Sequence, residues 1–416
     1  MSKLIISGGR PLVGTVDLPG AKNAILPLLA ATVLTGDKCE IHNCPSLTDV
    51  DACEKILRSL NCKVERRDGV TAVDSSDALF SPISESLMRE MRSSIVFLGA
   101  IVGRFGRAMM SNPGGCELGP RPIDIHLSSL RKMGVSITER DGILDCSTDR
   151  VCGADIVLPI PSVGATENIM LAAVFAKGVT HIVNAAREPE IRDLGCFLNE
   201  CGADIEGHGT SVITIRGVRK MHGTEHFAIP DRITAATYLC AVTASSGEIL
   251  IKNAVPDHLT SVIAAMRETG CEITETGDGL LARSKGRPKS IDKVSTMYYP
   301  GFPTDAGSLV LAVMTVSDGT GVLVENIFEN RYRCADELTR MGASIKVNGR
   351  MAVVIGKPRL NGANVKATDL RAGAALVIAG LAAEGITEVT GLEHIDRGYE
   401  SIERSFSDLG ADIRRV

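Results

Sequence analysis

A short phrase recurs six times along the chain, and this repeat constrains the fold more than any other feature of the sequence. In each copy an amphipathic helix end is followed by one small turn residue and a short alternating strand. The turn residues are Asn61, Gly134, Gly202, Gly270, Gly342 and Gly410, so consecutive turns are 73, 68, 68, 72 and 68 residues apart. Glycine is the residue that most readily adopts the left-handed conformation that ends a helix, and asparagine is the next best. The chain is therefore built from six similar units.

A second set of segments keeps the same period. Six apolar stretches each end in glycine, at residues 22–36, 92–106, 166–178, 231–247, 304–319 and 369–385. Most of them are apolar nearly all the way round, which is typical of buried helices. Because two independent markers share one period, each repeat is expected to hold one buried helix, one amphipathic helix and several strands.

Six units divide most simply into two α/β domains of three units each. We expect residues 22–229 in one domain, and residues 1–21 with 230–416 in the other. The last unit stops early, so the first strands, near 4–6 and 15–18, are expected to complete its sheet. The two chain crossings near Gly20 and Pro230 would then form a hinge, and hinged domains commonly bind a ligand in their cleft.

Composition excludes several classes of function. The net charge of −5, the aromatic content of 3% and the lack of Trp argue against a nucleic-acid-binding protein. No apolar run approaches the length of a membrane span. Twelve cysteines without a secretory signal indicate reduced thiols in the cytoplasm. Their spacing matches no zinc pattern, and we expect neither a metal nor a cofactor.

The segment 112–122 is a candidate lid. It holds three glycines and three prolines in eleven residues, with Cys116 near its middle and Arg121 five residues later. Such a composition disfavours helix and strand, and a mobile loop can carry a thiol and a cation onto a ligand. The alternative is a surface turn with a stray cysteine.

Polar residues gather at the starts of the predicted buried helices. They are Lys22, Asn23, Arg92, Ser162 with Val163 and Gly164 directly after it, Thr304, Asp305, Asp369 and Arg371. Helix N-termini attract anions. Asp and Thr are also ordinary helix caps, but a cation such as Lys22 or Arg371 opposes the helix dipole and indicates an anionic ligand.

Two loop arginines, Arg331 and Arg397, occupy matching points in successive units, although surface charge is the usual fate of an arginine. His126 and His394 are alternatives as bases, with a structural role as the default. Together the charges fit chemistry on a small, highly charged substrate, with Asp305 and Cys116 as the proton-transfer pair.

Seven ordered motifs spanning about 400 residues resemble one known family. They read PGAKNAILPLLAA, PGGCELGPRPIDIHL, SVGATENIM, GFPTDA, VENIFENRY, DLRAGAALVIAGLAAEG and HIDRGYE. In these motifs the chain resembles the UDP-N-acetylglucosamine 1-carboxyvinyltransferases, the enolpyruvyl transferases of peptidoglycan synthesis. The resemblance implies two inside-out α/β domains, each of three βαβαββ units, which agrees with the six repeats counted above.

The resemblance also implies an activity in cell-wall synthesis, and so in cell shape and division. The enolpyruvyl group of phosphoenolpyruvate would pass to the 3-hydroxyl of UDP-N-acetylglucosamine through a tetrahedral intermediate, with release of phosphate. The partners would be these two small molecules, with no nucleic acid and no membrane. The epoxide fosfomycin, a phosphoenolpyruvate mimic, would alkylate Cys116.

Residue roles follow from position in the family motifs. The implied catalytic residues are Cys116 as acid or covalent nucleophile, Asp305 as base, Lys22 and Arg397. Phosphoenolpyruvate would be bound by Lys22, Asn23, Arg121, Arg331, Arg371 and Arg397, with Asp369 supporting the reacting centre. The nucleotide sugar would be bound by Arg92, Arg121, Pro122, Ile123, Asp124, Ile125, Ser162, Val163, Gly164, Asp305 and Ile327.

A few positions depart from the family pattern. Ala306 and Gly307 follow the FPTD motif where a large apolar residue and Gln are usual, and Pro161, Thr234 and Ala236 are also atypical. Two other functions stay open: 3-phosphoshikimate 1-carboxyvinyltransferase, against which the 113–127 and 162–170 motifs count, and a paralogue that binds the nucleotide sugar and regulates without turnover.

Overall fold

The structure is a computed structural model that describes residues 2–111 and 123–416, apart from the side chain of Arg92. The described chain divides into two compact units. Residues 20–111 and 123–229 form what we call the N-terminal unit, and residues 2–19 and 230–416 form the C-terminal unit. Each unit has its own apolar core, and no residue belongs to both cores.

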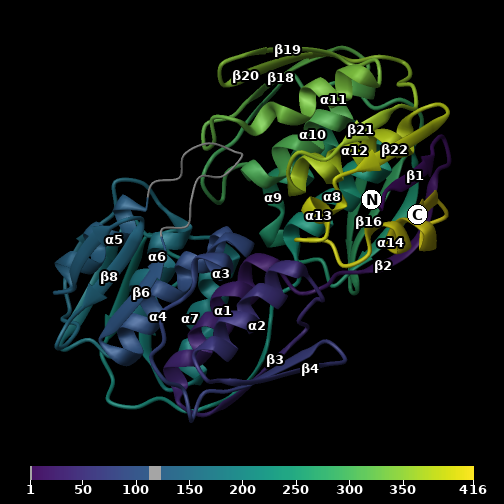
Figure 1. Ribbon diagram of the computed structural model, residues 1–416. Coiled ribbons are helices and arrows are strands. Elements are labelled where there is room, and N and C mark those ends of the chain that lie inside the picture. The colour runs from purple at the N-terminus through teal and green to yellow at the C-terminus, as the bar shows by residue number, and fades with distance from the viewer. Residues whose placement is uncertain (1, 112–122) are drawn as a thin grey trace. The chain divides into compact units, whose positions relative to one another are not determined.

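The N-terminal unit packs three helices at its centre and places its sheets around them (Figure 1). The central helices are α1 (Lys22–Thr35), α4 (Val96–Phe105), which continues the 3₁₀ turn η1 (Arg92–Ile95), and α6 (Val163–Ala173). The other helices are α2 (Thr48–Ser59), α3 (Glu85–Glu90), α5 (Asp124–Lys132) and α7 (Pro189–Glu200). The strands are β3 (Lys38–His42), β4 (Lys63–Arg67), β5 (Val70–Asp74), β6 (Arg107–Ser111), β7 (Ser136–Arg140), β8 (Ile143–Ser147), β9 (Asp155–Val157), β10 (Val179–Val183), β11 (Asp204–Glu206), β12 (Val212–Arg216) and β13 (Glu225–Phe227). Their sheet orders are β13-β3-β5-β4, β6-β8-β7 and β11-β12-β10-β9.

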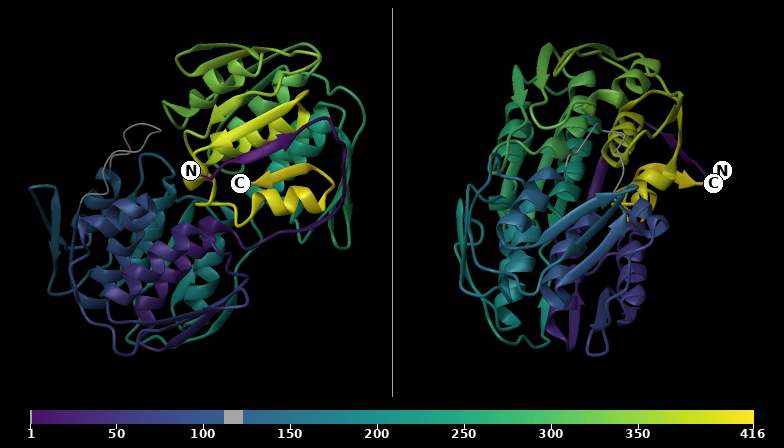
Figure 2. Two further views of the ribbon diagram at one scale, coloured as in Figure 1. Left: turned by 45° about the vertical axis from the view of Figure 1, so that its right-hand side comes forward. Right: turned by 60° about the vertical axis from the view of Figure 1, so that its left-hand side comes forward.

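The C-terminal unit repeats this plan (Figure 2). Its central helices are α8 (Arg232–Ser245), α10 (Thr304–Val316) and α12 (Leu370–Ala382), which pack on one another. The remaining helical segments are η2 (Pro256–His258), α9 (Thr260–Glu268), η3 (Arg331–Arg333), α11 (Cys334–Arg340), α13 (Leu392–Ile395) and α14 (Ile402–Asp408). The strands are β1 (Leu4–Ser7), β2 (Leu12–Asp17), β14 (Gly247–Lys252), β15 (Glu272–Thr276), β16 (Gly279–Ser284), β17 (Lys293–Ser295), β18 (Thr320–Val324), β19 (Ser344–Asn348), β20 (Met351–Ile355), β21 (Asn364–Lys366), β22 (Ile386–Thr390) and β23 (Asp412–Arg415). Its sheet orders are β15-β16-β14-β2, β17-β18-β20-β19 and β21-β22-β1-β23.

The backbone confirms the sixfold repeat. All six repeated turn residues adopt positive φ, at 64° for Asn61, 85° for Gly134, 97° for Gly202, 93° for Gly270, 93° for Gly342 and 88° for Gly410. The central helices are buried as expected: every residue of α1 except Asn23 is buried, and the helix ends at Gly36 with φ 63°. The α/β class with six similar units is therefore confirmed.

Several predicted helix ends are wrong. The helix expected at 166–178 begins at Val163 and ends at Ala173, and α10 and α12 end at Val316 and Ala382. The glycines that follow, at 178, 319 and 385, have φ of 100°, 117° and 90°. They turn the chain into the next strand, so they mark the start of that strand and not the end of the helix.

One of the two expectations for the first strands is also wrong. Strand β1 pairs antiparallel with β22 and β23 and completes the last sheet, as predicted. Strand β2, by contrast, pairs parallel with β14 in the first sheet of the C-terminal unit. Gly247 makes this pairing possible, because a Cβ there would lie 1.9 Å from the carbonyl oxygen of Leu12.

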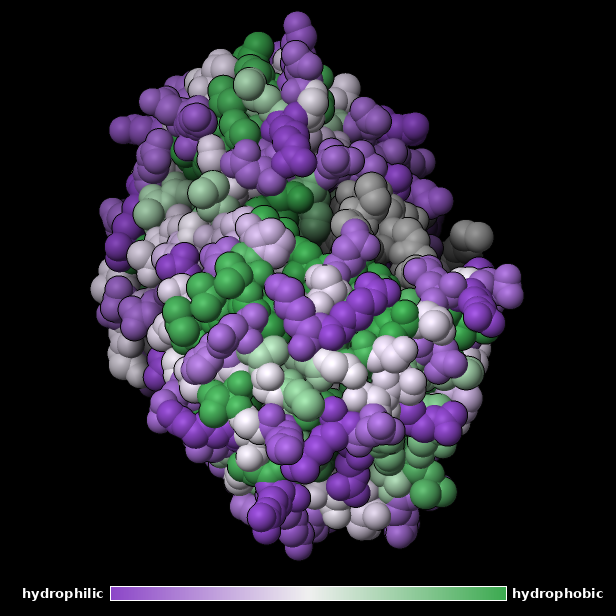
Figure 3. Space-filling view, turned by 90° about the vertical axis from the view of Figure 1, so that its left-hand side faces the viewer, coloured by the Kyte–Doolittle hydropathy of each residue, from purple (hydrophilic) through white to green (hydrophobic). Residues whose placement is uncertain are grey.

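The outer faces of the sheets carry part of the exposed apolar surface. Val157, Val183 and Val212 are exposed and adjacent in register on the sheet of β9, β10 and β12. On the face drawn in Figure 3, apolar patches are interrupted by hydrophilic side chains. Among residues 2–111 and 123–416, no helix combines the length and hydrophobicity needed to cross a bilayer.

Candidate functional site

Asp305 lies between two buried arginines in the C-terminal unit. It is the second residue of α10, and its Oδ1 accepts a hydrogen bond from Nη2 of Arg331 at 2.6 Å. Its Oδ2 accepts one from Nη2 of Arg371 at 3.1 Å. Both arginine side chains are 3% exposed, while that of Asp305 is 29% exposed. The carboxylate is thus held in one orientation and keeps an accessible side.

Arg331 also fixes the backbone at the start of α10. It begins η3, and its Nε and Nη2 donate to the carbonyl oxygen of Thr304 at 3.1 and 3.0 Å. One guanidinium therefore holds both the first residue of the helix and the carboxylate of the second. A planar fork of donors suits such a double contact better than an ammonium would.

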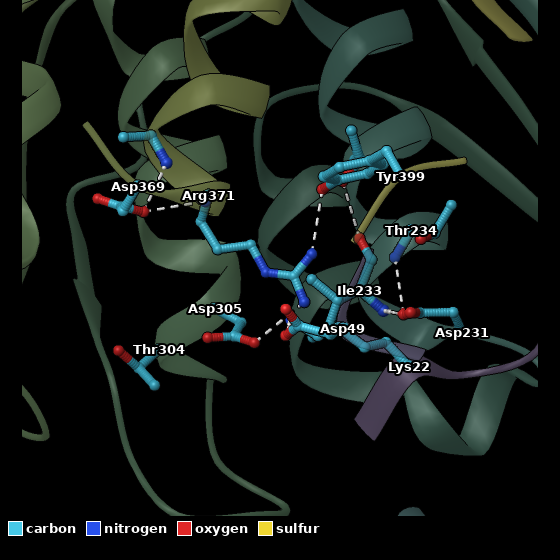
Figure 4. A network of polar contacts seen from close by, with 12 residues as sticks. Lys22, Asp49, Asp231, Ile233, Thr234, Thr304, Asp305, Asp369, Arg371 and Tyr399 are labelled. Atoms are coloured by element: carbon cyan, nitrogen blue, oxygen red, sulfur yellow. Dashed lines mark hydrogen bonds and ion pairs between the residues drawn. The ribbon is translucent and has the colours of Figure 1, made fainter. Parts of the chain in front are cut away.

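Arg371 is held from its other side by a chain of hydroxyl groups (Figure 4). Its Nη1 donates to the Tyr399 hydroxyl at 3.2 Å, and that hydroxyl lies 2.7 Å from Oγ1 of Thr237. Because Thr237 donates its own proton to the carbonyl of Ile233 at 2.9 Å, the Tyr399 proton must point to Thr237. Burial raises the pKa of Tyr399, and the contact with Arg371 opposes that rise in part. The hydroxyl therefore stays protonated and fixes the guanidinium.

Two aspartates cap the neighbouring helices of this unit. Asp369 Oδ1 accepts the amides of Arg371 and Ala372 at 2.9 and 3.0 Å, and Asp231 Oδ1 caps α8 in the same way. Asp369 is 9% exposed, and its Oδ2 has no hydrogen-bond partner in the part of the chain that the structure describes. Nε of Arg371 is likewise buried and without a hydrogen-bond partner among the described residues, so this helix start holds one donor and one acceptor that no described group satisfies.

Glu325 is a buried carboxylate that directly follows β18, the strand that comes after helix α10 with Asp305. Its Oε2 accepts the Thr304 hydroxyl at 2.9 Å. Its Oε1 accepts the Thr296 hydroxyl at 2.9 Å and the amides of Ile327 and Phe328 at 2.7 and 3.0 Å. The side chain thereby ties the start of α10 to the segment that follows β18.

In the N-terminal unit Lys22 forms a buried ion pair. It is the first residue of α1, and its Nζ lies 2.8 Å from Oδ2 of Asp49 in the first turn of α2. The two side chains are 9% and 1% exposed. Asp49 thus offsets the cost of a cation at a helix start. Asn23, next to Lys22, is partly exposed.

Asn168 joins three helices of the same unit. Its Oδ1 accepts the Gly99 amide of α4 at 2.6 Å. Its Nδ2 lies within hydrogen-bond distance of the carbonyls of Ile95 and Gly164, at 3.1 and 3.2 Å, and of His126 Nδ1 at 2.9 Å. Burial lowers the pKa of His126 to about 4, so the ring is neutral and Nδ1 accepts. This supports the structural role for His126.

The remaining predicted residues are placed as follows. Ser162 caps α6, with Val163 and Gly164 in its first turn, and all three are partly exposed. Ile123 precedes α5, Asp124 and Ile125 begin it, Ile327 follows β18, and Arg397 follows α13, in the loop before α14. Cys116, Arg121, Pro122 and the side chain of Arg92 lie outside the described part of the structure. The structure therefore brings Asp305, Arg331 and Arg371 into direct contact, and it places most of the other described ones at helix starts of their own unit, with Ile327 and Arg397 in loop segments.

Comparison with known proteins gives a consistent result. The family model described as EPSP synthase (3-phosphoshikimate 1-carboxyvinyltransferase) matches residues 6–406. UDP-N-acetylglucosamine 1-carboxyvinyltransferase 2 of Caldanaerobacter subterraneus subsp. tengcongensis is 51% identical over 416 residues, which is 100% of both chains. The chain belongs to the UDP-N-acetylglucosamine 1-carboxyvinyltransferase family.

Two further relatives agree with this carboxyvinyltransferase assignment. The enzyme of the same name from Carboxydothermus hydrogenoformans is 46% identical over 418 residues, again 100% of both chains. Among solved structures, the enolpyruvyl transferase NikO from Streptomyces tendae superimposes with a TM-score of 0.89 at 25% identity, covering 100% of this chain and 99% of its own. The family resemblance and the fold expected from it are confirmed.

Sequence reasoning missed the residues that hold the predicted ones in place. Asn168, Glu325 and Tyr399 all lie inside the carboxyvinyltransferase motifs SVGATENIM, VENIFENRY and HIDRGYE. Their signal was a polar residue within an otherwise apolar or turn-forming stretch. The partners that link them to the rest of the unit come from other elements, and nothing local in the sequence reveals those partners.

Proposed function

We propose that the protein transfers the enolpyruvyl group of phosphoenolpyruvate to the 3-hydroxyl of UDP-N-acetylglucosamine and releases phosphate, as the names of its full-length relatives imply. The observation that carries this proposal is the 51% identity over the whole chain to a protein of that name. The pairing of Asp305 with two buried arginines supports it, because the reaction needs a carboxylate base beside groups that bind anions.

In the proposed reaction the sugar 3-oxygen bonds to C2 of phosphoenolpyruvate while C3 takes up a proton. The C2–O bond to phosphate then breaks and C3 loses a proton, which restores the vinyl group. Asp305 accepts the hydroxyl proton, and Cys116 is the proposed acid at C3. Fixing one carboxylate oxygen to each arginine leaves Asp305 a single orientation from which to accept that proton.

An anionic substrate such as phosphoenolpyruvate requires positively charged side chains that donate hydrogen bonds to it. We assign phosphoenolpyruvate to Lys22, Asn23, Arg121, Arg331, Arg371 and Arg397, with Asp369 beside the reacting centre. The guanidinium groups of Arg331 and Arg371 support this assignment, because both lie beside the partly exposed Asp305. Guanidinium groups recognise phosphate and carboxylate through paired donors.

The nucleotide sugar is assigned to helix starts of the N-terminal unit and to the segment after β18. The proposed contacts are Arg92, Arg121, Pro122, Ile123, Asp124, Ile125, Ser162, Val163, Gly164, Asp305 and Ile327. Asn168 supports this assignment, because it links the starts of α4 and α6 with α5 through buried hydrogen bonds.

Phosphate release from phosphoenolpyruvate tests the proposal, with UDP-N-acetylglucosamine or shikimate 3-phosphate as acceptor. Release with the nucleotide sugar alone is expected. Release with shikimate 3-phosphate alone would replace the proposal by the activity that the family model names. Release with neither acceptor, despite tight binding of the nucleotide sugar, would favour a regulator.

The proposed lid cysteine has its own test. Incubation with fosfomycin and the nucleotide sugar should add one fosfomycin mass at Cys116, and an unchanged mass would count against its role. The cytoplasm remains the proposed location, since all cysteines in the described part of the chain are free thiols.

A further inference from the structure

We propose that Glu325 is a positioning residue that holds the base Asp305 and the nucleotide-sugar segment at Ile327 in one fixed geometry. The roles of Asp305 and Ile327 rest on the proposed function. The link between the two segments rests on hydrogen bonds that can be tested without it.

The carboxylate of Glu325 is the meeting point of three segments. The Thr296 hydroxyl follows β17, the Thr304 hydroxyl begins α10, and the amides of Ile327 and Phe328 follow β18. All four donate to Glu325, at distances from 2.7 to 3.0 Å. Thr296 adds a second tie, since its Oγ1 also accepts the Asn326 amide at 2.9 Å.

Because Glu325 is buried, its carboxylate depends on these hydrogen bonds. Glu325 is 1% exposed, and no lysine or arginine among the described residues forms an ion pair with it. A buried carboxylate is unfavourable unless hydrogen bonds satisfy it. Oε1 accepts from three donors, so a displacement of any one segment would leave part of the charge unsatisfied. The carboxylate therefore resists relative movement of the three segments.

The link continues from Glu325 to the proposed base. Thr304 is held on two sides: its hydroxyl donates to Glu325, and its carbonyl accepts from Arg331. Arg331 in turn donates to Asp305. A displaced Thr304 would move the carboxylate next to it in the helix and its arginine partner together.

Two matched hydroxyl deletions separate the two ends of the link. Thr304→Val removes the tie to α10 and should lower kcat about tenfold, since small misplacement of a reacting group is costly. Its KM for UDP-N-acetylglucosamine should change less than about twofold. Thr296→Val removes the tie to the 326–328 segment and should do the reverse, raising that KM with little change in kcat. The same methyl-for-hydroxyl change thus has opposite kinetic effects.

Variants of Glu325 itself test the coupling. Glu325→Leu should lower kcat and raise the KM together. In Glu325→Gln the amide oxygen can face the three donors while the NH₂ group donates to Thr304, so both constants should return to near those of the native chain. In the Glu325→Leu background, Thr304→Val should cause no further loss of kcat, because both changes remove the same hydrogen bond between Glu325 and Thr304.

Amide hydrogen exchange gives a readout that does not need activity. Glu325→Leu should speed exchange at Ile327 and Phe328, and Thr304→Val should not. If the native chain releases no phosphate with the nucleotide sugar, the proposed function fails and this exchange pattern alone decides the role of Glu325. If Glu325→Leu does not fold, the two threonine variants decide it.

Three results would overturn the proposal. The first is a folded Glu325→Leu variant with native kcat, KM and exchange. The second is a pair of threonine variants that shift kcat and KM alike. The third is a double variant in which the losses of kcat multiply.

Discussion

Each unit of the molecule has a buried side chain that makes four polar contacts at or near a helix start, but the two side chains differ in chemistry. In the N-terminal unit it is the neutral amide of Asn168, and in the C-terminal unit the carboxylate of Glu325. Neither side chain reaches solvent.

The groups that surround each position account for the difference. Asn168 faces one amide but two carbonyls and an imidazole nitrogen, so it must donate as well as accept. Glu325 faces only amides and hydroxyls and needs only to accept. A helix start can therefore be fixed by a neutral or by a charged group, and the unit that uses the charged one also carries the Asp305–arginine cluster.

The largest expected effect lies in that charged cluster. Asp305→Asn should reduce kcat by about 10²- to 10⁴-fold, because an amide cannot accept the hydroxyl proton. Phosphate release and calorimetric binding of UDP-N-acetylglucosamine measure turnover and binding separately. Binding within about tenfold of the native chain with turnover lost is the expected split. Turnover within tenfold of the native rate would show that Asp305 is not the base. The proposed catalytic role of the Asp305–arginine cluster would then be wrong.

Replacing the amide of Asn168 by a carboxylate tests whether this position in the N-terminal unit requires a side chain that donates hydrogen bonds. Asn168→Asp would place a carboxylate against the carbonyls of Ile95 and Gly164 and should cost about 3–5 kcal/mol of unfolding free energy. Protonation would relieve the repulsion, so the folded-state pKa of the new acid should be raised. The loss should therefore be greater at pH 8 than at pH 5. Denaturant unfolding at both pH values measures it.

The exposed Asn348 of β19 gives the matched control, because Asn348→Asp makes the same change at the surface. Its stability should stay near that of the native chain at both pH values. Equal losses for the two variants would show that the hydrogen bonds donated by the Asn168 amide group to Ile95 and Gly164 do not stabilise the protein.

A smaller effect is expected at a charged contact of the N-terminal unit that lies away from these helix starts. His226 Nδ1 lies 2.7 Å from Glu200, and its Nε2 lies 3.2 Å from Asp193. Burial disfavours the imidazolium, but the hydrogen bonds with the two carboxylates outweigh burial and raise the pKa of His226. A raised folded-state pKa stabilises below the unfolded value near 6.5, and this stabilisation is lost as pH rises through the folded value.

His226→Gln should accordingly cost about 1–2 kcal/mol at pH 6 and less at pH 9. Thermal or denaturant unfolding at the two pH values measures the difference. His222→Gln, at an exposed histidine, should show no such pH dependence. A loss from His226→Gln that grows toward pH 9 would contradict the assignment of a charged ring.

The features that the sequence predicts well are those encoded locally. A left-handed turn needs glycine or asparagine at one position, so the six turns could be located without knowing any partner. The expectation for strand β2 is wrong because its pairing with β14 depends on a close approach at Gly247, more than 230 residues away. The sequence does not reveal the roles of Glu325 and Asn168 for a similar reason, since each joins local contacts to partners from other elements, such as Thr296 and Thr304 for Glu325 and Gly99 and His126 for Asn168.

The smallest predicted effect is at Gly307, and it is compared with the same substitution at Gly99; each of these helical glycines lies beside one of the two buried residues. A Cβ at Gly307 would meet Oε2 of Glu325 and Cγ2 of Thr296 at 3.7 Å, which is ordinary contact. A Cβ at Gly99 would lie 2.3 Å from the carbonyl oxygen of Asn168, where backbone meets backbone. The same substitution should therefore have opposite signs at the two sites.

Gly307→Ala should stabilise the protein by about 0.5–1 kcal/mol, the usual gain from replacing glycine inside a helix. Gly99→Ala should destabilise it by about 1–3 kcal/mol or more, because α4 and α6 would have to separate. Melting temperatures of both variants, measured against the native chain, decide the sign at each site. A destabilised Gly307→Ala would mean that the surroundings of Glu325 are as tightly packed as those of Asn168, and that the space beside the carboxylate is already needed to keep its four donors in place.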